Sequence, residues 1–507
     1  MVRTVGGRTD RIVVVGAGLS GLAAAAHLAG RGREVVVLER EAVPGGRAGR
    51  LDVGGYRLDT GPTVLTMRDI VEETLAAVGS SVAERLDLVR LSPVYQAHFA
   101  DGSRLAVHSD AEAMAEEVRA FAGPEEARGY LRLRDWLGRL YRAEYDSFIA
   151  ANVDSPLGLL TPQLARLVAL GAFGTLDRRV GRYLRDERLR RVFSFQSLYA
   201  GVAPQRALAV YGVISYMDTV AGVFFPRGGV RALPDALASA AADAGVRFEY
   251  GATVTALERR GSRVSAVLTA GGDRFPCDAV VLTTEPALSY RLLGGAPRRP
   301  VALRAAPSAL VVHLGTPAEW DTGHHVISFG AAWRETFAEL IDHGRTMTDP
   351  SLLVTRPTAS DPALAPAGRD LLSVLAPVPN LDRGPIDWDR RGEDYARTVL
   401  EVVEDRLLPG LTNSAEVLHT ITPADWARAG LTAGTPFSYA HSLAQTGPFR
   451  PGNFPRLADN AVLAGSGTVP GVGVPTALIS GRLAAERVTG AAVPAGATSG
   501  TRSGRAG

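Results

Sequence analysis

Three glycines near the N-terminus have the spacing of a phosphate-binding turn. Gly16, Gly18 and Gly21 form a GxGxxG motif. The first glycine permits a tight turn, the second lets the backbone approach a pyrophosphate, and the third lets a helix pack against a strand. Glu39 lies where a carboxylate can accept hydrogen bonds from ribose hydroxyls. This acidic residue favours FAD or NAD, which carry a free 2′-hydroxyl, over NADP.

The residues around the motif predict the elements that such a site needs. The β-branched run at 11–15 is typical of a buried parallel strand, an alanine-rich helix is expected over 19–29, and a second buried strand over 34–38. Because strand, glycines, helix, strand and acid follow in this order, a glycine turn without a ligand is the weaker interpretation. The predicted nucleotide-binding residues of this unit are Gly16, Ala17, Gly18, Leu19, Ser20, Gly21, Glu39 and Arg40.

Two segments after the second strand favour a flavin over a nicotinamide dinucleotide. Gly46 would expose backbone amides near the pyrophosphate, and Arg47 can clamp a phosphate with two hydrogen bonds. A GGR tripeptide alone would be an ordinary turn, but this one lies beside Glu39. The sequence Gly61-Pro62-Thr63 forms a rigid turn that suits backbone running along a flat ring.

The far end of the chain is predicted to return to the same site. A strand at 461–464 leads into a glycine-rich loop, and a helix is expected from about Pro475, a favourable first residue, to about 488. The positive end of this helix would stabilise the anionic edge of a reduced flavin. The alternative is a second phosphate-binding turn without a redox role. The residues added to the site are Val254, Gly465, Gly473, Val474 and Pro475.

The pattern between the two ends predicts two interleaved domains. Helical periodicity covers about 123–191, a meander of strands about 254–276, and a buried strand 280–283. We therefore predict the α/β class, with a Rossmann-like FAD-binding domain (parallel sheet with β-meander) interleaved with a mixed α+β substrate domain. The predicted segments are 1–95, 224–300 and 456–489 for the FAD-binding domain, 96–223 (helical, facing substrate and membrane) and 301–455 for the substrate domain, and 490–507 for a disordered tail.

Composition excludes several other chemistries. The chain has 507 residues, enough for two or three domains, and a formal net charge of +2, which argues against nucleic acid as a partner. Cys277 is the single cysteine, so a disulfide framework and a CxxC redox pair are excluded. All 55 basic residues are arginine, which excludes a lysine Schiff base. The sequence shows neither a signal peptide nor a stretch of about twenty apolar residues, so we expect a cytoplasmic protein.

Six segments together resemble the bacterial phytoene desaturases, which are carotenoid-desaturating FAD enzymes of the amine-oxidase-like flavoprotein superfamily. The first segment is shared with many flavin oxidases, whereas the middle segments and the last are more specific. The segments are GAGLSGLAAAAHLAGRGREVVVLEREAVPGGRAGR, LDTGPTVLTM, FSFQSLYAGVAP, FFPRGGVRAL, DPSLLVTRPTASDPALAPAG and VLAGSGTVPGVGVPTALISGRLAAERV.

The resemblance implies FAD as the cofactor and dehydrogenation of a long, lipid-soluble polyisoprenoid such as phytoene. Hydride passes to flavin N5, a proton leaves the neighbouring carbon, and oxygen or a membrane quinone reoxidises the flavin. The sequence adds that a single GxGxxG is present, so no NAD(P) module is expected. Two alternatives remain: a carotenoid isomerase or a desaturase of a related polyene, and a non-catalytic flavin-binding scaffold of a pigment-synthesis complex.

A segment rich in apolar residues, 155–175, precedes an arginine-rich stretch, 178–191. A short apolar helix beside a basic stripe can lie in a bilayer interface, which predicts a peripheral protein on the inner face of the cell membrane. The alternative is a buried core helix followed by a solvated one. For the substrate channel we predict aromatic and apolar side chains that exclude water, although each aromatic residue taken individually is more often part of a core: Phe193, Phe195, Leu198, Tyr199, Phe224 and Phe225.

Neither a metal site nor a catalytic base identifies itself. His324 and His325 are adjacent, and two neighbours on a strand are expected to point to opposite faces, so we predict no metal site. His313 and His343 do not alter this, because no metal-ligand spacing accompanies them. Asp218 and Glu144 are possible proton acceptors, with surface or structural roles as the simpler interpretation. The catalytic residues therefore stay unassigned.

Overall fold

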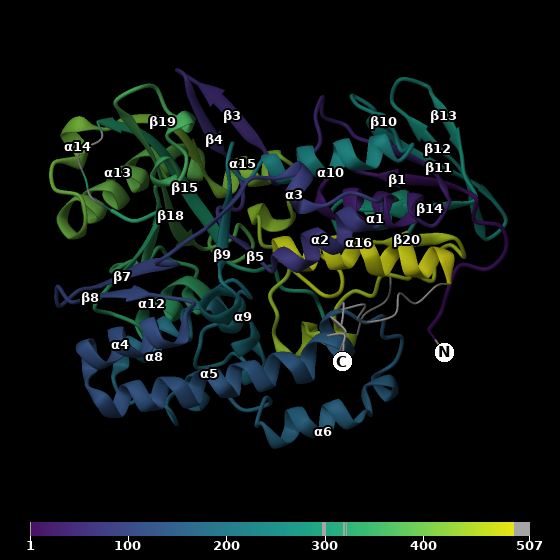
Figure 1. Cartoon of the computed structure of the whole chain (residues 1–507). Helices are drawn as coiled ribbons and strands as arrows, with labels where there is room; N and C mark the ends of the chain where they lie inside the picture. The colour runs from purple at the N-terminus through teal and green to yellow at the C-terminus, as the bar shows by residue number, and fades with distance from the viewer. Residues whose placement is uncertain (1, 297–300, 318–319, 321, 491–507) are drawn as a thin grey trace, which may run out of the picture.

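The computed structural model describes residues 2–296, 301–317, 320 and 322–490. The predicted disordered tail covers 490–507, and its residues 491–507 lie outside the described residues. Two halves are visible in Figure 1, one built on a parallel sheet and the other on a mixed sheet, with a helical layer below them.

A five-stranded parallel sheet forms the first half, and its strand order is β10-β2-β1-β14-β20. Its strands are β1 (Arg11–Val15), β2 (Glu34–Leu38), β10 (Arg247–Glu249), β14 (Ala279–Leu282) and β20 (Ala461–Leu463). Three segments that are far apart in the sequence therefore supply one sheet. This confirms the predicted parallel sheet.

The two faces of this sheet are covered by different layers, as the alternation of side chains along a strand requires. Ile12 and Val14 pack in one core with the helices, whereas Val13 and Val15 pack in another with the meander. The helices of this half are α1 (Leu19–Ala29), α2 (Arg68–Ala76), α3 (Val82–Arg85), α10 (Ala232–Asp243) and α16 (Val474–Thr489), and the other face carries β11 (Val254–Arg260), β12 (Arg263–Thr269), β13 (Arg274–Pro276) and α11 (Pro286–Leu292).

Helices α1 and α16 lie side by side and run in the same direction, which joins the two ends of the chain (Figure 1). At their contact, a Cβ on Gly481 would lie 2.2 Å from the carbonyl oxygen of Ser20, so a glycine is needed there. At their other end, Arg31 Nη1 donates to Thr489 Oγ1 at 2.9 Å.

A seven-stranded mixed sheet forms the second half, in the order β19-β15-β18-β17-β16-β7-β8. Its longest strands, β15 and β18, pair along ten residues each. The strands are β7 (Tyr95–Phe99), β8 (Arg104–Val107), β15 (Ser308–Pro317), β16 (His325–Phe329), β17 (Leu352–Thr355), β18 (Arg369–Val378) and β19 (Glu416–Ile421). One face packs against α13 (Trp388–Arg406), with α14 (Leu411–Ser414) and α15 (Pro423–Arg428) nearby.

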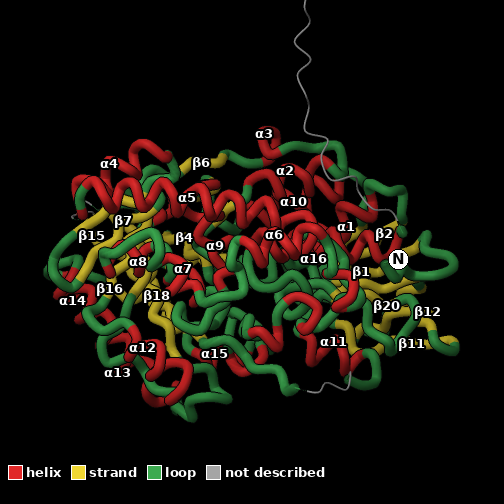
Figure 2. Tube along the Cα trace, turned by 90° about the horizontal axis from the view of Figure 1, so that it is seen from below, coloured by secondary structure: helices red, strands yellow, loops and turns green. Residues whose placement is uncertain are grey.

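The other face of the mixed sheet meets the helical region, which Figure 2 shows from below. The sequence interpretation of 96–223 as helical is incomplete, because β7 and β8 come from this region and β7 pairs with β16. Every second residue of β7 is buried, which is the pattern of a strand. The helices are α4 (Ala111–Ala122), α5 (Pro124–Glu144), α6 (Pro162–Ala169), α7 (Leu176–Val180), α8 (Glu187–Val192), α9 (Gly212–Tyr216) and α12 (Arg334–Phe337).

Two small sheets connect the halves. A hairpin of β3 (Arg50–Val53) and β4 (Tyr56–Asp59) leads to the turn at 61–63. A second sheet has the order β5-β9-β6 and consists of β5 (Leu65–Thr66), β6 (Leu88–Arg90) and β9 (Val223–Pro226). Within the described residues, no helix combines the length and the apolar character that crossing a bilayer requires.

Candidate functional site

The predicted glycine turn follows directly after β1, at the carboxyl edge of the parallel sheet. A Cβ on Gly21 would lie 1.9 Å from the Gly16 carbonyl oxygen, and a Cβ on Gly16 would lie 2.6 Å from Thr283 Oγ1. Thr283 itself donates to the carbonyl oxygen of Val15 at 2.8 Å. The turn is therefore so tight that side chains at 16 and 21 have no room.

Thr283 was missed by the sequence interpretation, although a signal for it exists. Thr283 directly follows β14, the strand beside β1. The carboxyl ends of neighbouring parallel strands meet at one edge of the sheet. Residues that follow such strands are candidates for the same site, even when they are distant in sequence.

Glu39 lies at the end of β2 with its carboxylate fixed by the backbone. It accepts from the Ala17 amide at 2.6 Å and from the Glu41 amide at 3.0 Å. The Ala252 amide donates to the Glu39 carbonyl oxygen at 2.8 Å, which brings the start of β11 and Val254 next to this residue. Arg40 is exposed, pairs with Glu41 and donates to the carbonyl of Ala429.

The segments at 45–47 and 61–63 lie against the glycine turn. Gly45 forms an isolated bridge with Gly18, and a Cβ on Gly61 would lie 1.8 Å from the Arg47 carbonyl oxygen. The Arg47 guanidinium forms an ion pair with Glu285, a residue that the sequence interpretation missed. Thr432 donates to the same Glu285 carboxylate at 2.9 Å, so this arginine is held in one position.

The C-terminal loop reaches the same place. A Cβ on Gly465 would lie 3.6 Å from the Thr283 carbonyl oxygen and 3.9 Å from Ser20 Oγ. The buried guanidinium of Arg450, also missed from the sequence, donates to the carbonyls of Ser466 and Thr468 at 2.6 and 2.9 Å. We refer to the partly or fully exposed glycines at this junction as the glycine strip: Gly16, Gly18, Gly46, Gly61 and Gly465.

Two helices present uncapped N-termini along the glycine strip. Gly18 precedes α1 and Gly473 precedes α16, and within the described chain no side chain caps either helix and no acid lies in either first turn. Because Gly481 meets Ser20, Val474 and Pro475 begin α16 about seven residues, or roughly 10 Å, further along the same line. Two positive helix ends at this separation fit FAD, with phosphates at α1 and the ring edge at α16.

The predicted channel residues divide into accessible and buried ones. Phe193 is only 1% exposed and packs on Tyr130, with ring centroids 5.6 Å apart. Leu198, Tyr199 and Phe224 are half-buried. Aromatic rings meet edge to face in a cluster that we call the aromatic wall, with centroids 5.7 to 5.8 Å apart: Tyr95, Phe195, Tyr199 and Phe329.

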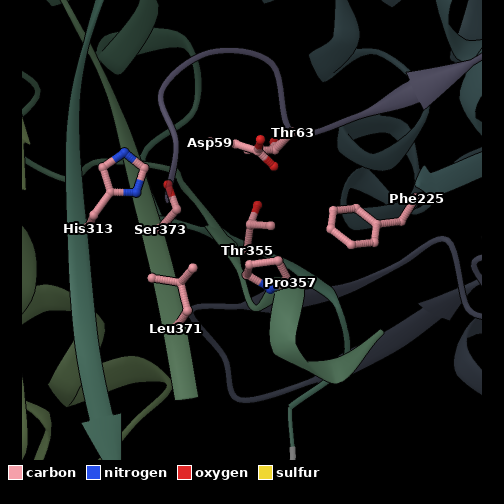
Figure 3. A pocket seen from close by; sticks show the side chains of 8 residues that line it. All are labelled: Asp59, Thr63, Phe225, His313, Thr355, Pro357, Leu371 and Ser373. Atoms are coloured by element: carbon pink, nitrogen blue, oxygen red, sulfur yellow. The ribbon is translucent and has the colours of Figure 1, made fainter. Parts of the chain in front are cut away.

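A cavity of about 10 Å³ lies where the turn at 61–63 faces the mixed sheet. Figure 3 shows its lining: Asp59, Thr63, Phe225, His313, Thr355, Pro357, Leu371 and Ser373. Asp59 accepts from the amides of Val230 and Arg231 at 2.8 and 3.1 Å. Burial raises the pKa of this carboxyl to about 6, although both amide hydrogen bonds oppose the rise. The contact between the two halves is thus closely packed and lined by polar groups.

The histidines of the second half have structural partners. The expectation that His324 and His325 point to opposite faces is wrong, because their ring centroids are 4.5 Å apart. His324 precedes the first residue of β16, so strand alternation does not apply to it. Their Nδ1 atoms pair with Ser360 and Thr355 at 2.7 and 3.0 Å. Over the described residues, no group of three or more potential ligands is placed to hold a metal ion.

Comparison with known proteins gives consistent matches over the whole length. The family described as flavin containing amine oxidoreductase matches residues 19–489. A phytoene dehydrogenase of Streptomyces griseus is 61% identical over 490 residues, covering 96% of each chain. A zeta-carotene-forming phytoene desaturase of Myxococcus xanthus is 37% identical, covering 94% of this chain and 93% of its own. A solved triple mutant of putrescine oxidase has the same fold, with a TM-score of 0.61 at 17% identity, covering 94% of this chain and 98% of that one.

Proposed function

The chain belongs to the flavin-containing amine oxidoreductase family, and we propose that it is an FAD-dependent phytoene desaturase. The observation that carries the proposal is the 61% identity to the Streptomyces griseus phytoene dehydrogenase over 96% of both chains. Two chains this similar over their whole length share their fold. The cofactor is FAD, and we assign the FAD-binding domain to 1–95, 224–300 and 456–489, and the substrate domain to 96–223 and 301–455.

Bound FAD supplies a hydride acceptor at N5 of its ring. The residues that would hold it are the predicted ones, with Thr283, Glu285 and Arg450 in supporting positions. The Glu39 carboxylate retains lone pairs for ribose hydroxyls beyond the two amides it already accepts. The uncapped N-terminus of α1 binds phosphate, and that of α16 stabilises negative charge on the ring.

The substrate is a lipid-soluble polyene, and the aromatic wall orients it and excludes water. Oxygen or a membrane quinone serves as the final electron acceptor. The desaturation can be tested with purified protein and phytoene in liposomes, with and without added FAD. New conjugation shifts the absorption bands to longer wavelength. An isomerase would leave the number of double bonds unchanged, and a scaffold would leave the spectrum unaltered.

The surface around α6 is the part proposed to meet the inner face of the membrane. In this helix Leu167 alone is buried, which disfavours the alternative of a core helix. Three apolar side chains in and around this helix are exposed: Leu160 at 74%, Val168 at 61% and Phe173 at 47%. Arg166, Arg178 and Arg182 are also exposed, and arginines beside exposed apolar groups attract anionic head groups.

A further inference from the structure

Two carboxyl groups lie in the interior of the helical region. Asp218 and Glu144 are 7% and 8% exposed, so the surface role considered for them from the sequence is wrong. Among the described residues, neither carboxyl forms a hydrogen bond or an ion pair, and Glu144 Oε2 is fully buried. A buried carboxyl without a partner costs stability, and a carboxyl in such a setting is a candidate for a functional role only where its surroundings supply a reacting partner.

Asp218 lies in a π-helical turn, Met217–Ala221, which directly follows a helix that is hydrogen-bonded to the 193–199 segment. One turn earlier, Ser215 Oγ donates to the Phe193 carbonyl at 3.1 Å and to Gln196 at 3.0 Å. Asp218 follows Ser215 by three residues, so the turn that carries it begins beside the 193–199 segment. Burial raises the pKa of Tyr95 and of Tyr199, and the negative charge of Asp218 adds to both shifts, as expected of a carboxyl in the same part of the interior.

The same turn contacts the flavin side of the molecule. It packs against β5 and β9, and β5 begins two residues after Thr63. In Figure 1, α9 and this region lie between these two strands and α5. The turn that carries Asp218 therefore contacts the strand that follows the turn at 61–63, and through α9 it adjoins the segment that supplies Phe195 and Tyr199.

Glu144 has a different environment. Its charge contributes to the raised pKa of Tyr211, whose hydroxyl pairs with Thr446 and whose ring meets His441 edge to face at 5.6 Å. His441 in turn packs against Gly471 of the C-terminal loop. Glu144 does not contribute to the raised pKa of Tyr95 or Tyr199, so it serves as a comparison: a second buried carboxyl without a partner.

We infer that Asp218 is the group that accepts the proton from the polyene during desaturation, an inference that rests on the proposed function. A C–H bond next to the carbon that loses hydride breaks, and its electron pair forms the new double bond. The proton passes to Asp218 Oδ, which changes from carboxylate to carboxylic acid. The hydride, with its two electrons, is transferred to the flavin, which is the oxidant in the proposed reaction.

The surroundings of Asp218 make it a suitable base. Burial alone raises the pKa of this carboxyl to about 7, so the carboxylate is basic and still present at neutral pH. Among the described residues, Tyr95 from β7 and Tyr199 from the 193–199 segment are the titratable groups whose raised pKa includes a contribution from Asp218. The nearby guanidinium of Arg134 on α5 is engaged with the carbonyl of Thr219 and the hydroxyl of Tyr130.

The test compares Asp218→Asn, Asp218→Glu and Glu144→Gln in the FAD-loaded protein with phytoene liposomes. We expect Asp218→Asn to lower the turnover about 100-fold, Asp218→Glu to restore part of it, and Glu144→Gln to retain it. Bound FAD stays at the wild-type ratio. The wild-type rate falls as the pH drops below about 7, because protonated Asp218 cannot accept a proton.

Stability separates this role from a structural one. The folded-state pKa of Asp218 lies above its unfolded value, so its contribution to stability is present at low pH and is lost as the pH rises through about 7. Asp218→Asn should therefore have a higher Tm than wild type at pH 8. A lower Tm, lost FAD or near wild-type turnover in this variant overturns the inference, as does loss of turnover in Glu144→Gln alone. A wild-type protein without desaturation overturns the proposed function, and the inference with it.

Discussion

The parallel-sheet half and the mixed-sheet half position their functional groups in different ways. In the first, the site is formed mainly by backbone: glycines at 16, 21 and 61 pack so closely that an added Cβ would lie less than 3 Å from a neighbouring atom. In the second, side chains from distant segments meet, as when Tyr95 of β7, Phe195 and Phe329 of β16 form the aromatic wall. Backbone-built sites tolerate almost no substitution, whereas side-chain-built sites change gradually.

The largest effect is expected from Gly21→Ala. The new Cβ would lie 1.9 Å from the Gly16 carbonyl oxygen, and backbone cannot move away without opening the turn. We expect a loss of more than about 3 kcal/mol in unfolding free energy and protein without bound flavin, measured by denaturant unfolding and by absorption.

Two other glycines serve as controls for this change. At Gly6 no atom lies within 4 Å of an added Cβ, so Gly6→Ala should match wild type. At Gly18 the nearest atom is 4.0 Å away, so Gly18→Ala should keep its stability and bind FAD more weakly, because the methyl group occupies the approach to the phosphates. Equal behaviour of all three variants would contradict the role of backbone packing.

The sequence predicts the first half well because its information is local. Gly16, Gly21 and Glu39 lie within one strand–helix–strand unit. Their spacing alone predicts where the helix packs against the strand and where the backbone can approach a phosphate. Even the meeting of α1 with the C-terminal helix follows from two glycine-rich segments, each next to a buried strand. Thr283 was missed although it follows a buried strand, because its contacts depend on which strand lies beside β1. Arg450 was missed because no local pattern in the sequence indicates a buried guanidinium.

For the mixed-sheet half, the sequence predicted the α+β class but not the strand pairing. Strands β7 and β16 pair although more than two hundred residues separate them in the sequence, and neither segment has a feature that predicts its partner. Likewise, Phe193 and Phe195 are two residues apart in sequence and both are buried, but Phe193 packs on Tyr130 whereas Phe195 joins the aromatic wall. Asp218 shows the same limit, since its burial depends on how α9 packs against other elements.

Replacement of two aromatic residues in the same segment tests this half. Phe193→Leu removes a fully buried ring, so we expect a loss of about 1 to 3 kcal/mol in unfolding free energy with unchanged product. Tyr199→Leu affects a half-buried ring of the aromatic wall. It should cost less stability and alter KM or the number of double bonds introduced, measured by chromatography of the pigments. Identical product patterns in both variants would remove Tyr199 from the channel.

Acid should act on the parallel-sheet half through His27. Burial in α1, together with the charges of Arg31 and Arg482, lowers its pKa to about 3. A histidine with a depressed folded-state pKa stabilises the fold above about pH 6.5, and this contribution is lost as the pH falls toward 3. At pH 5 the loss is about 2 kcal/mol. His27→Leu should lack it, so its Tm should fall less than that of wild type between pH 8 and pH 5.

The exposed His343 provides the control for the replacement of a histidine as such, in the variant His343→Gln. His324 and His325 of the other half also have lowered pKa values because they are buried, and they remain in both variants. Part of the acid sensitivity should therefore persist in His27→Leu. Complete loss of that sensitivity would mean that the mixed-sheet half does not contribute.

The smallest effect on stability is expected at the surface around α6. Leu160→Ser and Val168→Ser replace side chains that are 74% and 61% exposed, so the unfolding free energy should change by less than about 0.5 kcal/mol. Binding to liposomes with anionic lipids, measured by cosedimentation, should nevertheless weaken, because apolar area no longer inserts at the interface. The exposed Val417 on β19, at 54%, lies on the other half and provides a control in Val417→Ser. If all three variants bind liposomes equally, the membrane contact lies elsewhere, and the exposed apolar side chains around α6 need another explanation.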